Sequence, residues 1–64
     1  MRIKKLRVDK GLSQAEFARL IGVTQQAVAK YEAGVANPRA ACLPRIAKTL
    51  NCTIEELYDE GETA

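Results

Sequence analysis

The fold is decided by residues 13–34, which read SQAEFARLIGVTQQAVAKYEAG. Ser13 and Glu16 have the spacing of a capping box, in which the hydroxyl accepts an amide of the first helical turn and the carboxylate accepts the amide of the cap residue. Gly22 tolerates positive φ and suits the end of this first helix. Thr24 then suits the N-cap of a second helix. The stretch therefore predicts two short helices joined by a tight turn.

The apolar spacing in this stretch is that of a helix-turn-helix. Two helices that cross steeply at a tight turn need a small residue where their backbones approach, and Ala18 stands four residues before Gly22. Val23 and Val28 are placed to fill the angle between the helices. Val28 and Tyr31 face the core by their helical spacing, which leaves the opposite side of the second helix exposed.

Helical signals continue on both sides of this unit. Apolar residues at helical spacing predict three further helices: Ile3 and Leu6 in a basic segment ending near Lys10 and Gly11; Leu43, Ile46, Ala47 and Leu50; and Ile54, Leu57 and Tyr58. Pro44 fits a first turn, where a missing N–H has little effect. Thr53 and Glu56 repeat the capping box. Strand alternation is absent, so we expect an all-α bundle of five short helices.

The longest loop is expected between Gly34 and Cys42, with a turn at Asn37-Pro38. We expect one helix-turn-helix domain over residues 1–58. The remaining residues, 59–64, form an acidic tail that we expect to be frayed.

Composition excludes several kinds of chemistry. The 64 residues include no His, one Ser and two Cys. A Cys/His zinc site needs more ligands than this, and a Ser–His or Cys–His nucleophile pair needs a histidine. A Lys- or carboxylate-based enzyme remains formally open, but nothing in the sequence would build it a pocket. We therefore expect no enzyme, no metal and no cofactor. No apolar run is long enough to span a membrane or to serve as a signal peptide, so we expect a soluble, cytoplasmic protein.

Charge is divided unevenly along the chain. Residues 1–48 hold all ten Lys and Arg and three acids, a net charge of +7, whereas residues 49–64 hold five acids and no base, a net charge of −5. A basic body with an acidic tail is expected of a protein with one face against a polyanion. The alternative is an ordinary solvated surface with a polar tail, and charge alone favours this alternative, so the spacing of the other residues has to decide.

In the two-helix unit, the exposed side of the second helix, which is the third of the five expected helices, carries the residue types that read base edges. Gln can pair with adenine N6 and N7 in the major groove, and Lys can reach guanine or a phosphate. We expect this helix, residues 24–33, to lie in the major groove with Gln25, Gln26 and Lys30 toward the DNA. The alternative for both glutamines is that they are merely exposed helix formers.

The motif of residues 13–34 closely resembles the helix-turn-helix of the Cro and lambdoid phage repressor superfamily, the XRE type. The resemblance extends upstream to Leu6 and Arg7 and downstream to Leu57. It implies a five-helix, lambda-repressor-like DNA-binding domain without catalytic residues. It also implies that Gln14 anchors a phosphate and that Arg7 forms a structural ion pair with Glu32. It further implies that four residues face the bases in the groove: Thr24, Gln25, Gln26 and Lys30.

The chain departs from the family pattern at two positions. Ala33 stands where many relatives have an Asn that contacts the DNA backbone, so one phosphate contact is put in doubt. Asn51 replaces a common Gly after the fourth helix, although Asn also tolerates the left-handed conformation.

Three further features lie outside the helix that is expected in the major groove, residues 24–33. Asn37 and Arg39, in the loop after it, are candidate phosphate contacts, which fix register and carry no sequence information. We expect Cys42 and Cys52 to be small core or boundary residues rather than a redox switch. We expect Leu20 to be exposed, since relatives usually have a polar residue there.

We expect a sequence-specific regulator of double-stranded DNA, a repressor, that acts as a homodimer. The candidate dimer surface is formed by Ile54, Leu57 and Tyr58, of which Ile54 and Leu57 are also needed in the core. Two alternatives remain. One is an antitoxin-type or accessory regulator whose main ligand is a protein partner. The other is a protein-interaction module that has kept the fold and lost the DNA-binding face.

Overall fold

The computed structural model describes residues 1–58, so the predicted acidic tail lies outside the described residues. The elements are α1 (Ile3–Asp9), α2 (Gln14–Ile21), α3 (Gln25–Ala33), the 3-10 helix η1 (Ala40–Cys42), α4 (Leu43–Thr49) and α5 (Ile54–Tyr58). Within the described part of the chain there is no strand. The prediction of an all-α bundle of five short helices is confirmed.

Side-chain caps begin three of the helices as predicted. Ser13 Oγ accepts the Glu16 amide at 3.0 Å, and Glu16 accepts the Ser13 amide at 2.9 Å. This hydrogen bond from the Ser13 amide lowers the pKa of the Glu16 carboxyl. Thr53 and Glu56 form the same reciprocal pair at 3.0 and 2.8 Å. Thr24 Oγ1 accepts an amide of the first turn of α3 at 3.1 Å. Each cap satisfies amides that have no partner within their own helix.

Left-handed residues end α2 and follow α4. Gly22, at φ 78°, is the C-cap of α2, and its amide reaches back to the last turn of the helix. Asn51 adopts φ 56° after α4, the conformation that Asn was expected to tolerate. One boundary differs from the prediction, because η1 occupies the second half of the loop expected between Gly34 and Cys42. Residues 40–42 contain no Gly or Pro to prevent this turn.

All five helices contribute to one core. Among residues 1–58, ten buried apolar residues make up this core: Ile3, Phe17, Ala18, Ile21, Val28, Leu43, Ile46, Ala47, Leu50 and Leu57. Full burial of a large apolar side chain stabilises a fold by roughly 1.5–3 kcal/mol. Phe17 is the largest of the fully buried side chains among the described residues, so among alanine substitutions in the core Phe17→Ala should destabilise the domain most, by about 3–5 kcal/mol.

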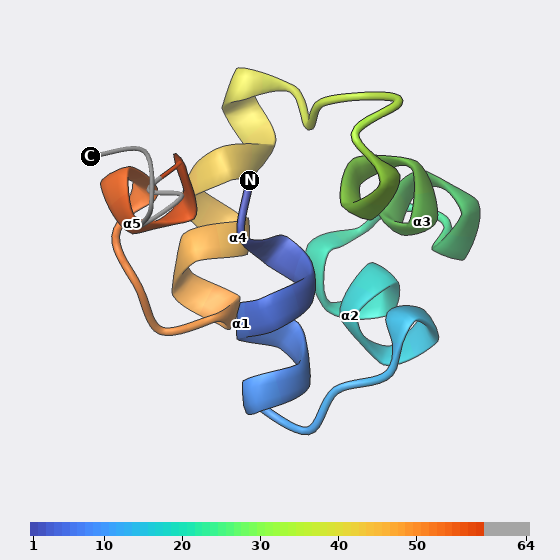
Figure 1. Ribbon diagram of the computed structural model, residues 1–64, viewed down its shortest axis with the longest axis horizontal. Helices are drawn as coiled ribbons and strands as arrows, with labels where there is room; N and C mark the ends of the chain where they lie inside the picture. Colours follow the sequence, from blue (N-terminus) through green and yellow to red (C-terminus); the bar gives the residue numbers. More distant parts are fainter. Residues whose placement is uncertain (59–64) are drawn as a thin grey trace.

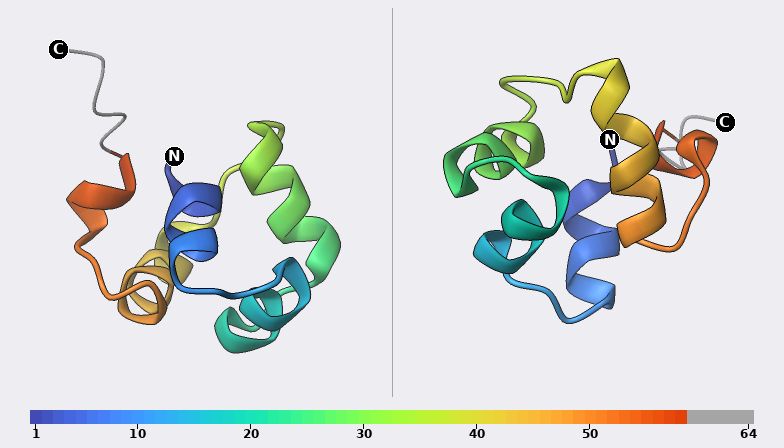
Figure 2. Two further views of the ribbon diagram at one scale, coloured as in Figure 1. Left: turned by 60° about the horizontal axis from the view of Figure 1, so that its bottom comes forward. Right: turned by 180° about the vertical axis from the view of Figure 1, so that it is seen from behind.

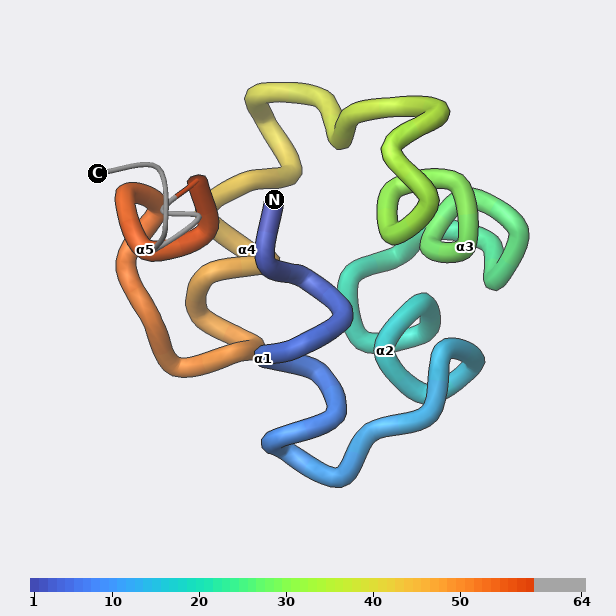
Figure 3. The backbone as a smooth tube through the Cα atoms, viewed as in Figure 1, coloured from blue at the N-terminus to red at the C-terminus, as the bar shows by residue number. Residues whose placement is uncertain are grey.

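Helix α1 lies in the middle of the molecule, with α2 and α3 on one side and α4 and α5 on the other (Figure 1). The Arg2 amide donates to the Leu57 carbonyl at 2.9 Å, which joins the start of the chain to α5. The longest connection runs from α3 to η1 along one edge of the molecule (Figure 3). The arrangement holds α2 and α3 together as a unit on one side of the bundle.

Candidate nucleic-acid interface

The turn between α2 and α3 has the geometry that its sequence predicted. Ala18 is buried, and its carbonyl accepts the Val23 amide at 2.9 Å across the turn. Val28 is fully buried on the inner side of α3. In the left-hand view of Figure 2, α3 stands across α2. The inner side of α3 is thus fixed to the core, and its other side is left for contact with a ligand.

The outer side of α3 carries polar side chains without protein partners. Gln25, Gln26 and Lys30 are exposed, and none of the three side chains makes a hydrogen bond or ion pair with the described residues. Thr24 is exposed as well, but its hydroxyl oxygen already caps α3. The hydroxyl hydrogen of Thr24 remains able to donate. The three long side chains are therefore available to a partner molecule in full.

One carboxylate of α3 holds both α1 and α2. Glu32 Oε2 accepts Arg7 Nε at 2.6 Å, and Glu32 Oε1 accepts Arg7 Nη2 at 3.2 Å. Arg7 Nη1 also donates to the Leu12 carbonyl at 2.6 Å. The two side chains of the pair are only 10% and 5% exposed. The geometry is bidentate, which is the strong form of an arginine–carboxylate pair.

The same carboxylate is shared with Gln14 at the beginning of α2. Gln14 Nε2 donates to Glu32 Oε1 at 2.9 Å. Burial raises the pKa of Glu32, but the hydrogen bonds from Arg7 and Gln14, together with the charges of Arg7 and Lys4, outweigh it. The pKa of Glu32 therefore lies below its ordinary value, and the carboxylate is ionised at neutral pH.

The contact between Gln14 and Glu32 was not foreseen from sequence. It uses one of the two hydrogens on the Gln14 amide nitrogen and leaves the other free to donate. A free donor at this place is what a phosphate contact requires. The hydrogen bond also fixes the plane of the amide, so the direction of the free hydrogen depends on α3.

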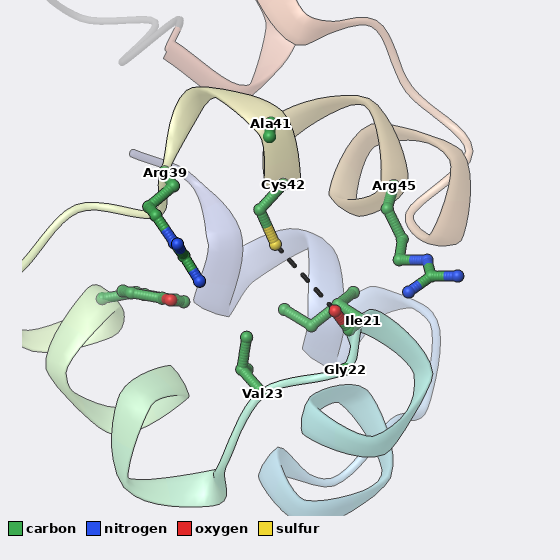
Figure 4. Close-up of a pocket in the computed structure, with 8 residues that line it drawn as sticks. Ile21, Gly22, Val23, Arg39, Ala41, Cys42 and Arg45 are labelled. Carbon is green, nitrogen blue, oxygen red and sulfur yellow. Dashed lines mark hydrogen bonds between the residues drawn. The ribbon is translucent and has the colours of Figure 1, made fainter.

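The loop after α3 brings two predicted phosphate contacts to the surface. Asn37 and Arg39 are exposed on either side of Pro38, which is buried. Neither side chain has a hydrogen bond or ion pair with residues 1–58. Arg39 does not extend straight into solvent, because its side chain reaches over a pocket between the loop and the turn of Gly22 (Figure 4).

The sequence of the chain shows to which protein family this arrangement of helices belongs. The sequence matches the helix-turn-helix family over residues 3–57, which is most of the chain. This chain belongs to the helix-turn-helix family. Among solved structures, none matches the chain significantly.

Relatives of this helix-turn-helix chain include proteins named as regulators of transcription. The chain is 36% identical to the cryptic phage CTXphi transcriptional repressor RstR of Vibrio cholerae, over 97% of this chain and 56% of the relative. It is 38% identical to an SPbeta prophage-derived uncharacterized HTH-type transcriptional regulator, YonR of Bacillus subtilis, over 88% of this chain and 52% of the relative. An uncharacterized HTH-type transcriptional regulator of Archaeoglobus fulgidus is 33% identical, with 89% of this chain and 81% of the relative covered.

The chain therefore spans about half the length of its phage and prophage relatives. The match supports the XRE-type resemblance of the sequence and an all-α DNA-binding fold. It places the chain in a family of DNA-binding transcription regulators.

The surface predicted for a second copy of the helix-turn-helix domain needs one correction. Ile54 is 39% exposed and Tyr58 is 52% exposed, but Leu57 is completely buried. Helix α5 is short, and Leu57 is its buried residue, packed into the core. Leu57 therefore cannot contribute to a dimer surface, and two of the three residues remain.

The structure also shows where the other residues that were singled out from the sequence lie. Leu20 is 52% exposed, as expected. Cys42 and Cys52 are free thiols that pack against the core while half-buried. Burial, together with the charge of Glu56, raises the pKa of the Cys52 thiol. Within residues 1–58, no group of His, Cys, Asp or Glu side chains is arranged to hold a metal ion. No helix there is both long and apolar enough to cross a bilayer.

Proposed function

We propose that this helix-turn-helix chain binds double-stranded DNA at specific sequences and regulates transcription, with α3 in the major groove. The observation that carries the proposal is the unpartnered polar face of α3, formed by Gln25, Gln26 and Lys30. A side-chain amide can donate to adenine N7 and accept from adenine N6 at once, so each glutamine favours adenine in the half-site. Lys30 reaches guanine or a phosphate, and the Thr24 hydroxyl donates nearby.

Backbone contacts on both sides of α3 set the register. Gln14 offers its second amide hydrogen to a phosphate at the beginning of α2. Asn37 and Arg39 offer unpartnered donors from the loop after α3. These contacts orient the domain on any duplex, whereas the glutamines select the sequence.

The chain acts as a repressor and as a homodimer in this proposal. A single domain of this size makes few base contacts, and a two-fold dimer doubles them across half-sites about one helical turn apart. The exposed apolar side chains of Ile54 and Tyr58 support a contact between copies near α5. The name of the Vibrio cholerae relative, a phage repressor, supports the direction of regulation. In the same proposal the protein works in the cytoplasm, where the DNA that it regulates lies.

The salt dependence of binding to a random duplex tests the proposal. Each phosphate that the protein neutralises should contribute about −0.9 to the slope of log K against log salt concentration. Arg39→Ala should make that slope shallower by about one phosphate's share. Lys48→Ala, which removes an exposed cation outside the proposed contacts, is the matched control.

A near-zero slope in the folded protein would contradict DNA binding and would leave the protein-interaction module as the function. An equal change in the Lys48 control would show a general effect of charge, and Arg39 would lose its proposed role.

A further inference from the structure

A pocket of about 420 Å³ lies beside the helix-turn-helix unit, and none of the proposed base contacts lines it. Its walls come from the turn after α2, from the inner part of α3 and from the junction of η1 with α4 (Figure 4). Sites for small molecules range from roughly 300 to 1,000 Å³, so the pocket is large enough for a ligand of modest size.

The floor of the pocket is apolar. Ile21 and Val23 line it from the turn, and Cys42 lines it from η1, as Figure 4 shows. Tyr31 adds an aromatic ring from α3. The Cys42 thiol donates to the Ile21 carbonyl at 3.9 Å, so this donor is already in use. Such a floor favours an apolar or aromatic body over a bare inorganic ion.

Two guanidinium groups flank this floor. Arg39 approaches from the loop and Arg45 from α4, on opposite sides in Figure 4. Neither arginine has a hydrogen bond or an ion pair with the described residues, and no acidic side chain lines the pocket. Arg45 Nη1 lies so close to the turn that a Cβ on Gly22 would meet it at 3.3 Å. The uncompensated positive charge calls for an anion.

We propose that this pocket binds a small organic anion with an aromatic or apolar body and a carboxylate or phosphate-ester head. The body packs on Ile21, Val23 and Tyr31. The head accepts hydrogen bonds from Arg39, and Arg45 adds positive charge from the opposite side of the pocket. Guanidinium groups match the planar geometry of both head groups. Since Arg39 is also proposed to hold a DNA phosphate, the bound anion competes with DNA and acts as an inducer. This last step rests on the proposed function, whereas the binding step does not.

Binding is tested without DNA, by titrating the folded protein with benzoate and following its backbone amides by NMR. Saturable shifts should be confined to the amides around Gly22 and Ala41. Acetate, which lacks the body, and benzyl alcohol, which lacks the charge, should each bind about tenfold more weakly. Arg39→Met and Arg45→Met keep the apolar stem and should each weaken benzoate binding about five- to tenfold. Arg19→Met removes an exposed arginine of α2 outside the pocket and should leave the affinity unchanged.

Three results would overturn the binding step: no saturable shift at millimolar benzoate, shifts spread over the whole surface, or an equal loss in the Arg19 control. Phenyl phosphate should saturate the pocket at millimolar concentration, whereas inorganic phosphate should not. Saturation by both would show a site for any anion and would contradict the proposed ligand class.

The inducer step is tested separately, on a duplex that the protein binds. Benzoate should lower DNA affinity in the unaltered protein and should have less effect in Arg45→Met, which keeps Arg39. Benzoate binding without any effect on DNA affinity would overturn the inducer step alone. A protein that binds benzoate but no DNA would refute the proposed function and leave the pocket assignment standing.

Discussion

Replacing Glu32 by leucine removes the carboxylate that joins α1 and α2 to α3. Arg7 is only 8% exposed, and both oxygens of Glu32 accept hydrogen bonds from it. The variant therefore leaves a buried guanidinium with the Leu12 carbonyl as its remaining partner. Gln14 also loses the acceptor of its amide nitrogen.

The expected loss is large for a domain of this size. Removing one partner of a buried ion pair costs about 3–5 kcal/mol. At roughly 0.05–0.15 kcal/mol per residue, 64 residues are stable by about 3–10 kcal/mol in total. Glu32→Leu, or Arg7→Met on the other side, should therefore remove between about a third and all of the domain's stability.

The double variant Arg7→Met/Glu32→Leu is the informative one. It removes both charges and buries apolar side chains in their place, which is often nearly neutral. We expect it to be more stable than either single variant, with a coupling energy of about 2 kcal/mol or more between the two sites.

Urea unfolding followed by far-UV circular dichroism measures all three variants. Asp9→Asn is the matched control, because the Lys5–Asp9 pair is 3.5 Å long with side chains 64% and 60% exposed. Breaking this exposed pair should cost no more than about 0.5 kcal/mol. If the single variants lose no more than this control, or if their losses simply add in the double variant, the reasoning about a desolvated pair is wrong.

Three further predictions concern pH, the turn and base recognition. The pKa of Glu32 lies below its ordinary 4.5, so the stabilisation that the Glu32 carboxylate gives is complete above that pH and is lost as the pH falls through the folded-state pKa. Urea unfolding at stepped pH should show the difference in stability between the unaltered protein and Glu32→Gln closing there. A difference that stays constant would contradict this. Gly22→Ala and Gly11→Ala each force a side chain into φ near +75° and should each cost about 1–2 kcal/mol in thermal unfolding. Of these two glycines only Gly22 has a close neighbour, so a far smaller loss for Gly22→Ala than for Gly11→Ala would contradict this. Gln26→Ala should cost about 1–3 kcal/mol on a preferred duplex and little on random DNA; equal losses in a fluorescence anisotropy assay would remove Gln26 from the base-reading set.

Local signals were sufficient to predict most of the fold. Ser13 and Glu16 lie three residues apart in one chain segment, so the capping box needs no tertiary information. Gly22 ends α2 for an equally local reason, its positive φ. Only the 3-10 turn at the end of the predicted loop was missed.

Features that depend on the approach of distant segments were harder to predict. Gln14 and Glu32 are eighteen residues apart, and their hydrogen bond exists because α2 and α3 cross near that point. Leu57 is on a helix of five residues, too short for its apolar spacing to separate a buried face from an exposed one. Arg39 and Arg45 line one pocket only after η1 and α4 have packed beside the turn.

The central claim is that the exposed face of α3 reads DNA sequence. Selection from a pool of randomised duplexes at near-physiological salt, followed by sequencing of the bound fraction, tests it most directly, with Gln26→Ala carried in parallel. The account predicts a two-fold symmetric motif with adenines in each half-site, and a loss of adenine preference at one position of each half-site in the variant. No enrichment by the folded protein, or a motif that the variant selects unchanged, would contradict the claim.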